Sequence, residues 1–280
     1  VALCNQKGVG WAFKDRPRSE AWLTTKIPGC VAGLGGPFLG AELSACTAYT
    51  ERMLADTMQQ LDMPYVDLLL LHWAPLFKTE NYGDLAKPKL STCGATTCEL
   101  IKAQWAVMIG AYMDGKARAI GVSSYCASCT QCLYDAAKAD PKGLGRVLPM
   151  VNQIQFHVGM QGGPDPTGLS SFLRRHGTVP MAYSPLHAPE PQSSLAFDPT
   201  LKAIGQELTP TRTAAEVALR WLAQEGVPMA TATTNATHLR AAYEAVKLDS
   251  VAGWELPLTL KAKLDDYRGA QEDPVREFCD

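Results

Sequence analysis

The stretch Asp67–Pro75 reads DLLLLHWAP and decides the fold that we expect for this chain. Its apolar run has the length of a strand, and Pro64 and Pro75 bound it, which favours a strand buried on both faces over a helix. His72 then lies at the carboxyl end of that strand, where parallel α/β folds place their chemistry. The sequence therefore predicts a parallel sheet with a functional histidine at one edge.

Other segments alternate between strand and helix patterns with short connections, as in a parallel sheet covered by helices. Five more strands are expected at Trp22–Lys26, Ala117–Val122, Leu148–Gln155, Val179–Tyr183 and Val227–Thr231. Helices are expected after the N-cap Asn5 and over residues 45–61, 98–114 (ended by Gly115), 126–138, 169–176, 213–225, 238–246 and 257–268. Because no composition break divides the chain, we predict a single domain over residues 1–280. An eight-stranded (β/α)8 barrel fits this pattern if its first two strands precede Val1.

Composition narrows the class of partner. The chain is 46% hydrophobic and 19% charged, which is ordinary for a soluble globular protein with a full core. A net charge of −2 and a pI near 6.2 argue against nucleic acid or an anionic membrane as the main partner. The sequence contains no apolar run of the roughly 20 residues that a membrane span needs. No cleavable signal pattern opens the chain, so the sequence leaves the compartment unknown, and we expect a soluble protein that is either cytoplasmic or organellar.

Nine cysteines are many for a reducing cytosol, but their odd number and scatter do not suggest a secreted disulfide framework. Cys93 and Cys98 would form a disulfide if the compartment were oxidising. Cys126, Cys129 and Cys132 stand three residues apart at a helix start. A metal site there would need a fourth ligand, and no histidine is near in the sequence, so we predict buried or surface thiols and no metal.

Seven stretches, in this order and spacing, resemble the aldo-keto reductase superfamily. They are NQKGVGWAF at 5–13, LTTK at 23–26, DLLLLHWAP, DGKARAIGVSS at 114–124, VNQIQFH at 151–157, AYSPL at 182–186 and TATTNATHLRAAYEA at 231–245. The resemblance implies an eight-stranded parallel barrel that binds a nicotinamide cofactor without a Rossmann domain. In keeping with this, no G-x-G-x-x-G follows a strand.

The family reduces aldehydes and ketones by hydride transfer from NADPH, and a proton goes to the developing alkoxide. Its machinery is a tyrosine acid, a lysine that lowers the tyrosine pKa, an aspartate paired with the lysine, and a histidine that orients the carbonyl. By position, the lysine is Lys26 and the histidine is His72, with Trp73 as a wall of the carbonyl pocket. The tyrosine position is Leu3, and the aspartate position falls before Val1. Leucine cannot donate a proton, so His72, a water, the Cys4 thiol or Tyr82 of a long polar loop would have to replace it.

The resemblance also implies the cofactor contacts. Residues matched to the nicotinamide and pyrophosphate are Ser123, Ser124, Gln153, Tyr183, Ser184 and Leu186, and those matched to the adenosine end are Thr233, Asn235 and His238. Tyr183 is the ring on which the nicotinamide stacks. Where the family often has a lysine and an arginine on the 2′-phosphate, this chain has Ala232 and His238, which weakens the electrostatic case for NADPH.

Two functions follow as hypotheses. The first is an NADPH-dependent reductase of a small-molecule aldehyde or ketone, in which Lys26, His72 and Tyr183 face one nicotinamide-shaped hollow. The second is a catalytically inactive relative that serves as a structural or accessory subunit of a larger assembly, which Leu3 favours. A third possibility is a sensor that keeps cofactor binding without turnover.

Overall fold

The computed structural model of the chain describes residues 5–30, 42–75, 93–160, 165, 168–187, 194–247 and 254–269. Its strands are β1 (Thr24–Ile27), β2 (Val66–Leu71), β3 (Ala117–Ser123), β4 (Val151–Gln155), β5 (Val179–Tyr183) and β6 (Met229–Ala230). Their order in the sheet is the order of the sequence, from β1 to β6. All of the strands that the sequence predicts in this part of the chain are therefore confirmed, and the fold is an α/β fold with parallel strands.

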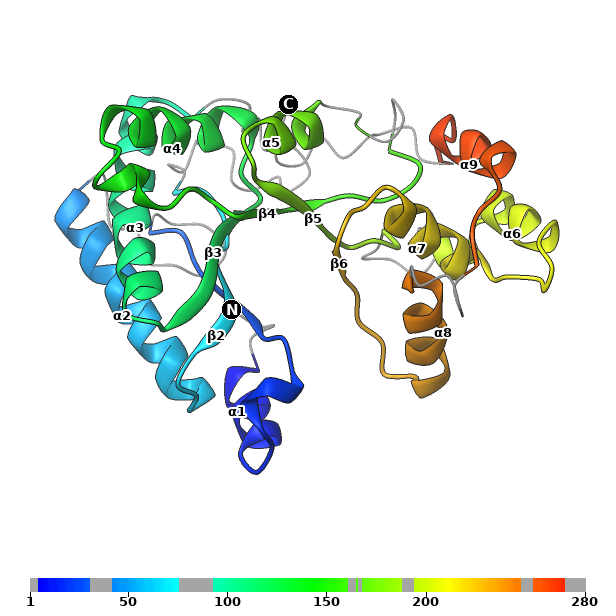
Figure 1. Cartoon of the computed structure of the whole chain (residues 1–280), viewed down its shortest axis with the longest axis horizontal. Helices are drawn as coiled ribbons and strands as arrows, with labels where there is room; N and C mark the ends of the chain where they lie inside the picture. Colours follow the sequence, from blue (N-terminus) through cyan, green and yellow to red (C-terminus); the bar gives the residue numbers. More distant parts are fainter. Residues whose placement is uncertain are drawn as a thin grey trace, which may run out of the picture. The chain divides into compact units, whose positions relative to one another are not determined.

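Helices alternate with these strands (Figure 1). The α-helices are α1 (Gln6–Phe13), α2 (Leu43–Leu61), α3 (Ala95–Met113), α4 (Ala127–Ala139), α5 (Leu169–Arg175), α6 (Pro199–Gln206), α7 (Ala214–Gln224), α8 (Ala236–Val246) and α9 (Leu258–Asp265). Short 3₁₀ turns are η1 (Arg18–Glu20), η2 (Leu144–Arg146) and η4 (Leu195–Phe197). None of the described helices is long and apolar enough to cross a membrane.

The chain forms two compact units. The first holds residues 1–152 with 175–178 and 277–280, and the second holds residues 153–174 and 179–276. The prediction of a single domain stays a prediction.

In the first unit, β1, β2 and β3 pair in parallel, with Lys26 level with Leu70 and Leu70 level with Gly121. All six residues of β2 are buried, as its apolar run predicts. Helices α2 and α3 lie side by side and also contact β1 and β3, respectively. The core that results includes Leu69, Trp105 and other apolar side chains of strands and helices. The parallel pairing of β1–β3 aligns the carboxyl ends of these strands at one edge of the sheet.

Asp67 is the one charged residue of β2, and it is buried. Its carboxylate accepts hydrogen bonds from the Leu23 backbone N–H at 2.8 Å and from Arg118 at 3.0 Å, and it also pairs with Arg18. Burial acts to raise the pKa of Asp67, but these hydrogen bonds and the charge of Arg18 outweigh it, so the pKa is lowered. The buried charge is thus fully partnered, which a strand interior requires.

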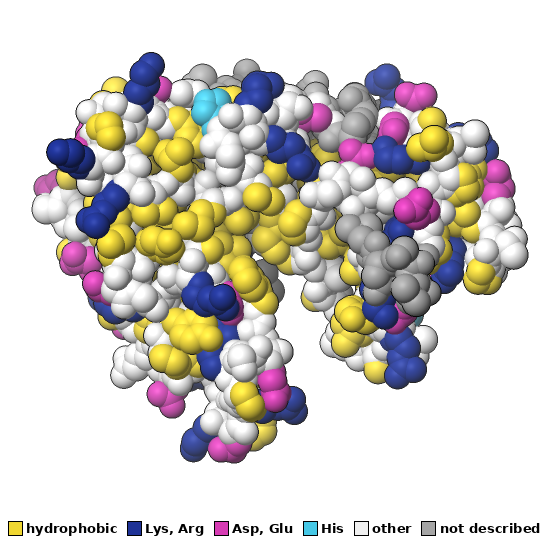
Figure 2. Space-filling view, viewed as in Figure 1, with side chains coloured by type: hydrophobic (Ala, Val, Ile, Leu, Met, Phe, Trp, Pro, Cys, Tyr) yellow, Lys and Arg dark blue, Asp and Glu magenta, His cyan; other side chains and the backbone are white. Residues whose placement is uncertain are grey.

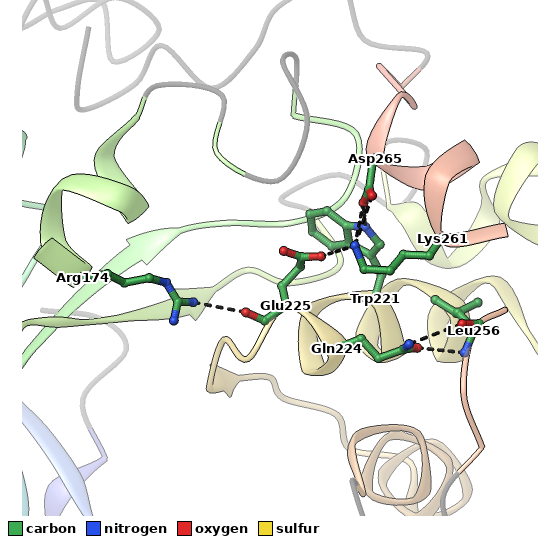
Figure 3. Close-up of polar contacts among 7 residues, drawn as sticks. All are labelled: Arg174, Trp221, Gln224, Glu225, Leu256, Lys261 and Asp265. Atoms are coloured by element: carbon green, nitrogen blue, oxygen red, sulfur yellow. Dashed lines mark hydrogen bonds and ion pairs between the residues drawn. The ribbon is translucent and has the colours of Figure 1, made fainter. Parts of the chain in front are cut away.

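In the second unit, β5 and β6 pair in parallel, with Tyr183 level with Ala230. Helix α7 begins with a capping box between Thr213 and Glu216, and its residues Val217 to Leu222 are all buried. A polar network joins α9 to α7 (Figure 3).

Within this network, the indole Nε1 of Trp221 donates to Asp265 Oδ1 at 2.7 Å. The ammonium of Lys261 pairs with Asp265 at 3.1 Å and with Glu225. Burial acts to lower the pKa of Lys261, but the hydrogen bonds and charges of Glu225 and Asp265 outweigh it, so the pKa is raised. Helix α9 is therefore anchored by partly buried polar contacts as well as by Leu260 and Leu264, which are buried.

Two predicted helix ends are confirmed, and one helix was missed. Asn5 caps α1 through a hydrogen bond from Gly8 N, and Gly115 follows α3 with φ +73°, both as predicted. Helix α6 was not predicted. Its signal was present, because Asp198 accepts a hydrogen bond from Leu201 N and Pro199 fills the first position of the helix.

The cysteine prediction was wrong in its pairing. Cys93 bonds to Cys129 and Cys98 bonds to Cys132, with Cα–Cα distances of 5.0 and 5.5 Å. Cys129 and Cys132 are three residues apart on one face of α4, which therefore presents both sulfurs to the start of α3. Cys30 and Cys46 form a further disulfide.

The expectation that Cys126, Cys129 and Cys132 are thiols was wrong, because all three are disulfide-bonded. Across the described ranges, no group of three or more His, Cys, Asp or Glu side chains is arranged to hold a metal ion.

Candidate functional site

The carboxyl ends of β1, β2 and β3 bring three predicted site residues together. Lys26 lies near the end of β1, His72 directly follows β2, and Ser123 ends β3. The Lys26 Nζ donates a hydrogen bond to Ser123 Oγ at 3.2 Å, which spans the width of β2 between them. We call Lys26, His72 and Ser123 the carboxyl-edge site. It places a cation, an imidazole and a hydroxyl on one edge of the sheet.

The backbone of His72 is hydrogen-bonded to β1, and the surroundings of its side chain lower its pKa. Its N–H donates to the carbonyl of Ile27 at 2.7 Å, which ties the residue to β1. Burial, and then the positive charge of Lys26, lower the pKa of His72 from 6.5 to about 4. The imidazole is therefore neutral at pH 7, so it offers one N–H donor and one nitrogen acceptor rather than a transferable charge.

Trp73 lies beside His72, with ring centroids 4.3 Å apart and planes tilted by 37°. A Cβ on Gly29 would come within 2.7 Å of the indole, so glycine is required where this turn meets the ring. The indole Nε1 is buried, and among the described residues it has no hydrogen-bond partner. A buried indole N–H without a partner costs free energy, which is a feature of sites that a ligand completes.

Ser123 and Ser124 occupy the end of β3 in different ways. Ser123 is fully buried, whereas Ser124 is half-buried and has φ +54°. A left-handed conformation at a serine costs about 1–3 kcal/mol, and strained residues of this kind cluster at active sites and ligand clamps.

The second unit holds the other predicted nicotinamide residues. The Gln153 side chain is buried in β4 and its amide contacts Met181 Sδ at 3.4 Å. Tyr183 ends β5 with a half-buried side chain, and its carbonyl accepts from Phe156 N at 3.5 Å. Ser184 follows with φ +50°, a second strained serine directly after a strand.

A backbone hydrogen bond links Leu186, after β5, to Leu195 at the start of η4. The Leu186 carbonyl accepts from Leu195 N at 2.9 Å.

The adenosine-end residues lie at the start of α8. Thr233, Asn235 and His238 are exposed, and Asn235 is the N-cap of the helix. The Asn235 Oδ1 accepts from the backbone N–H groups of Thr237 at 2.8 Å and His238 at 3.4 Å. The asparagine therefore has a structural role whether or not it meets a cofactor.

The chemistry of these residue types can be compared with the needs of a nicotinamide dinucleotide. Ser123 and Gln153 supply the hydroxyl and amide that suit a carboxamide, and Tyr183 supplies an aromatic face for the ring. The adenosine positions supply hydroxyl, amide and imidazole groups but neither lysine nor arginine. The donor set thus fits the nicotinamide end and lacks the cations that a 2′-phosphate attracts.

Sequence reasoning gave no role to a pair of histidines in the second unit. The rings of His157 and His187 lie 4.9 Å apart, at the ends of the segments that follow β4 and β5. Burial is the main cause that lowers the pKa of His157 to about 4, and the charge of His187 adds to it. His157 stands within VNQIQFH and His187 directly after AYSPL, so their proximity follows only from the parallel pairing of the strands.

Three residues named in the sequence predictions lie outside the described residues. They are Leu3 at the tyrosine position and the alternative proton donors Cys4 and Tyr82.

Comparison with known proteins identifies the fold and family. The model of the aldo/keto reductase family matches residues 5–252. "Aldo-keto reductase family 4 member C11" of Arabidopsis thaliana is 29% identical over 218 residues, which is 77% of this chain and 61% of that protein. An "Aldo-keto reductase" of Mycobacterium avium is 27% identical over 96% of this chain and 80% of its own length. The chain thus matches less than two thirds of the length of the Arabidopsis relative.

Solved structures agree with the fold. The aldose reductase of Schistosoma japonicum has a TM-score of 0.67 at 16% identity, over 98% of this chain and 80% of that one. At this identity the likeness shows the fold alone, which is the α/β fold predicted from the ordered strands.

Proposed function

Because this chain belongs to the aldo/keto reductase family, we propose that it transfers hydride between a nicotinamide dinucleotide and an aldehyde or ketone. The observation that carries the proposal is the carboxyl-edge site, where Lys26 Nζ lies 3.2 Å from Ser123 Oγ and close enough to His72 to lower its pKa. A carbonyl that accepts hydride develops negative charge on oxygen, and preorganised donors stabilise that charge best in a buried site.

Each residue of the proposed site has a distinct role. Lys26 supplies fixed positive charge beside the developing alkoxide. His72, neutral at pH 7, donates an N–H hydrogen bond that orients the carbonyl oxygen. Trp73 excludes water from one side of the carbonyl, and its unpartnered indole N–H is available to a substrate oxygen.

When bound, the cofactor would supply the hydride. In the family's usual reaction this cofactor is NADPH. Ser123 and Gln153 would hold its carboxamide and Tyr183 its ring, with Ser184, Ser124 and Leu186 near the phosphates. Thr233, Asn235 and His238 would meet the adenosine end. Since Leu3 cannot act as an acid and neutral His72 is a poor one, the proton reaches the alkoxide from solvent, and turnover is slow.

The test is a steady-state assay with NADPH and 4-nitrobenzaldehyde, followed by absorbance of the reduced nicotinamide. We expect a measurable rate that falls about 10²-fold in His72→Ala and in Lys26→Met, because each removes a group that contacts the developing charge. His176→Ala is the matched control, since His176 stacks on Tyr134 away from the carboxyl-edge site and its loss should leave the rate within about twofold. A wild-type rate equal to that of His72→Ala would refute the reductase proposal.

Leu3 favours a second candidate, a catalytically inactive relative that serves as an accessory subunit. This reading predicts no turnover in the same assay and elution of the native protein at the size of a complex. Elution at the size of a monomer would contradict it.

A further inference from the structure

A pocket of about 390 Å³ lies between the carboxyl end of α1 and the turn that follows α2. We call it the α1 pocket; the residues of its lining that carry the argument are Lys7, Trp11, Phe13, Lys14, Arg16 and Asp62. Its volume is within the range of small-molecule sites. Its walls are fixed, because Gly10 of α1 lies so close to the end of α2 that an added Cβ would meet the Leu61 carbonyl at 2.3 Å.

The charge of this lining is strongly one-sided. The side chains of Lys7, Lys14 and Arg16 form no ion pair or hydrogen bond within the described part of the chain. A fourth cation in the lining, Arg18, is neutralised by Asp67. Against the three unpaired cations stands one carboxylate, that of Asp62. This concentration of positive charge in a chain whose net charge is −2 favours an anion.

Aromatic surface accompanies the charge. Trp11 is 80% exposed, and Phe13 next to it in the lining is half-buried. Figure 2 shows dark blue and yellow side chains at the lower end of the view, over α1, with some magenta carboxylate side chains among them. An indole left in solvent beside cations offers a face on which a planar ring can stack.

The α1 pocket is remote from the carboxyl-edge site. Asp62, Met63 and Pro64 line the pocket and lie a few residues before β2, so the pocket lies at the amino edge of this strand. His72 lies beyond the other end of β2, about 20 Å away at the rise of a strand. A ligand in the pocket would therefore not contact the reacting groups.

We propose that the α1 pocket binds a small organic anion that carries a planar ring, an aryl phosphate or aryl carboxylate. The ring stacks on Trp11, and the anionic group is reached by Lys14, Arg16 and Lys7. This site is independent of the proposed reductase function.

Isothermal titration of the full chain with phenyl phosphate at low salt tests the proposal. We expect one-to-one binding that weakens at least tenfold in Lys14→Glu and in Arg16→Glu, and about fivefold or more in Trp11→Ala. Lys202→Glu makes the same change of charge at an exposed position of α6, and it should leave the dissociation constant within about twofold. Inorganic phosphate, which lacks the ring, and benzyl alcohol, which lacks the charge, should each bind at least tenfold more weakly.

Three results would overturn the proposal: no heat of binding up to millimolar phenyl phosphate, equal weakening by Lys202→Glu and Lys14→Glu, or equal affinity for inorganic phosphate. Equal weakening by Lys202→Glu and Lys14→Glu would indicate a general effect of the protein's charge. Equal affinity for inorganic phosphate would indicate that the pocket binds an anion without recognising a ring. Far-UV circular dichroism of each variant shows whether it is folded, and Lys14→Gln, a milder change, replaces any charge-reversal variant that is not.

Discussion

Two histidines at strand ends show how burial changes the chemistry of a single residue. His72 follows β2 and His157 follows β4, and burial is the largest cause that lowers the pKa of each to about 4. Both imidazoles are therefore neutral in the folded chain at pH 7. For His72 this neutrality supports an orienting role rather than proton donation. For His157 the lowered pKa affects stability, because this imidazole binds a proton more readily in the unfolded chain than in the folded one.

We expect the free energy of unfolding to depend on pH through His157. Its folded pKa of about 4 is below the unfolded value of 6.5, so its contribution is fully present above pH 6.5 and is lost as pH falls toward 4. Replacement by glutamine should therefore reduce the loss of stability between pH 7 and 4.5 by roughly 1–3 kcal/mol, measured by urea unfolding. His238→Gln, at the exposed start of α8, is the control. An unchanged pH dependence in His157→Gln would contradict the assigned burial effect.

At the scale of elements, two disulfides join the start of α3 to α4. Cys93–Cys129 and Cys98–Cys132 connect residues that are 36 and 34 positions apart. Cross-links over loops of this length restrict the unfolded chain substantially. Because both close nearly the same loop, the second adds less than the first. The disulfides thus cross-link the two helices that precede and follow β3 in the chain.

Removal of one of these cross-links should cost about 2–4 kcal/mol of unfolding free energy. The experiment compares urea unfolding of the wild type with that of Cys98→Ser combined with Cys132→Ser. Because the remaining disulfide closes nearly the same loop, the loss of unfolding free energy in the double variant should lie at the lower end of this range. Chemical reduction of all disulfides in the wild type should cost more unfolding free energy. If the urea midpoint of the double variant equals that of the wild type, the cross-link does not constrain the unfolded chain.

Over the whole molecule, the residues that match the family's cofactor contacts are divided between the two units, and each unit is described by itself. The first holds Lys26, His72 and Ser123, whereas the second holds Tyr183 and the residues at the start of α8. The second unit lacks lysine and arginine at the positions that match a 2′-phosphate. A charged contact to phosphate contributes more than a neutral hydrogen bond, so its absence removes the basis for selecting NADPH over NADH.

Thermal unfolding with each cofactor tests this expectation. At equal concentrations, NADPH and NADH should raise the melting temperature by similar amounts, corresponding to dissociation constants within about fivefold of each other. A matched variant, Ala232→Lys, should favour NADPH by restoring one cation. A shift with NADPH alone in the wild type would show that another cation meets the phosphate.

Much of this protein could be predicted from local patterns. The short apolar run of β2, closed by His72, and the alternation of strands with helices determined the α/β fold, because strand burial and capping are properties of neighbouring residues. The same local order placed Lys26, His72 and Ser123 at strand ends. Parallel pairing then brings such ends to one edge.

Other features were decided by tertiary structure alone. The sulfurs of Cys93 and Cys98 pair with α4 rather than with each other, because the packing of α3 on α4 sets which sulfurs meet. The His157–His187 contact and the α1 pocket likewise join residues whose distance in sequence carries no signal. The sequence by itself determined the six strands and every described α-helix except α6, with some boundaries shifted by a few residues. Only the packed structure determined which side chains face one another, since that depends on contacts between distant segments.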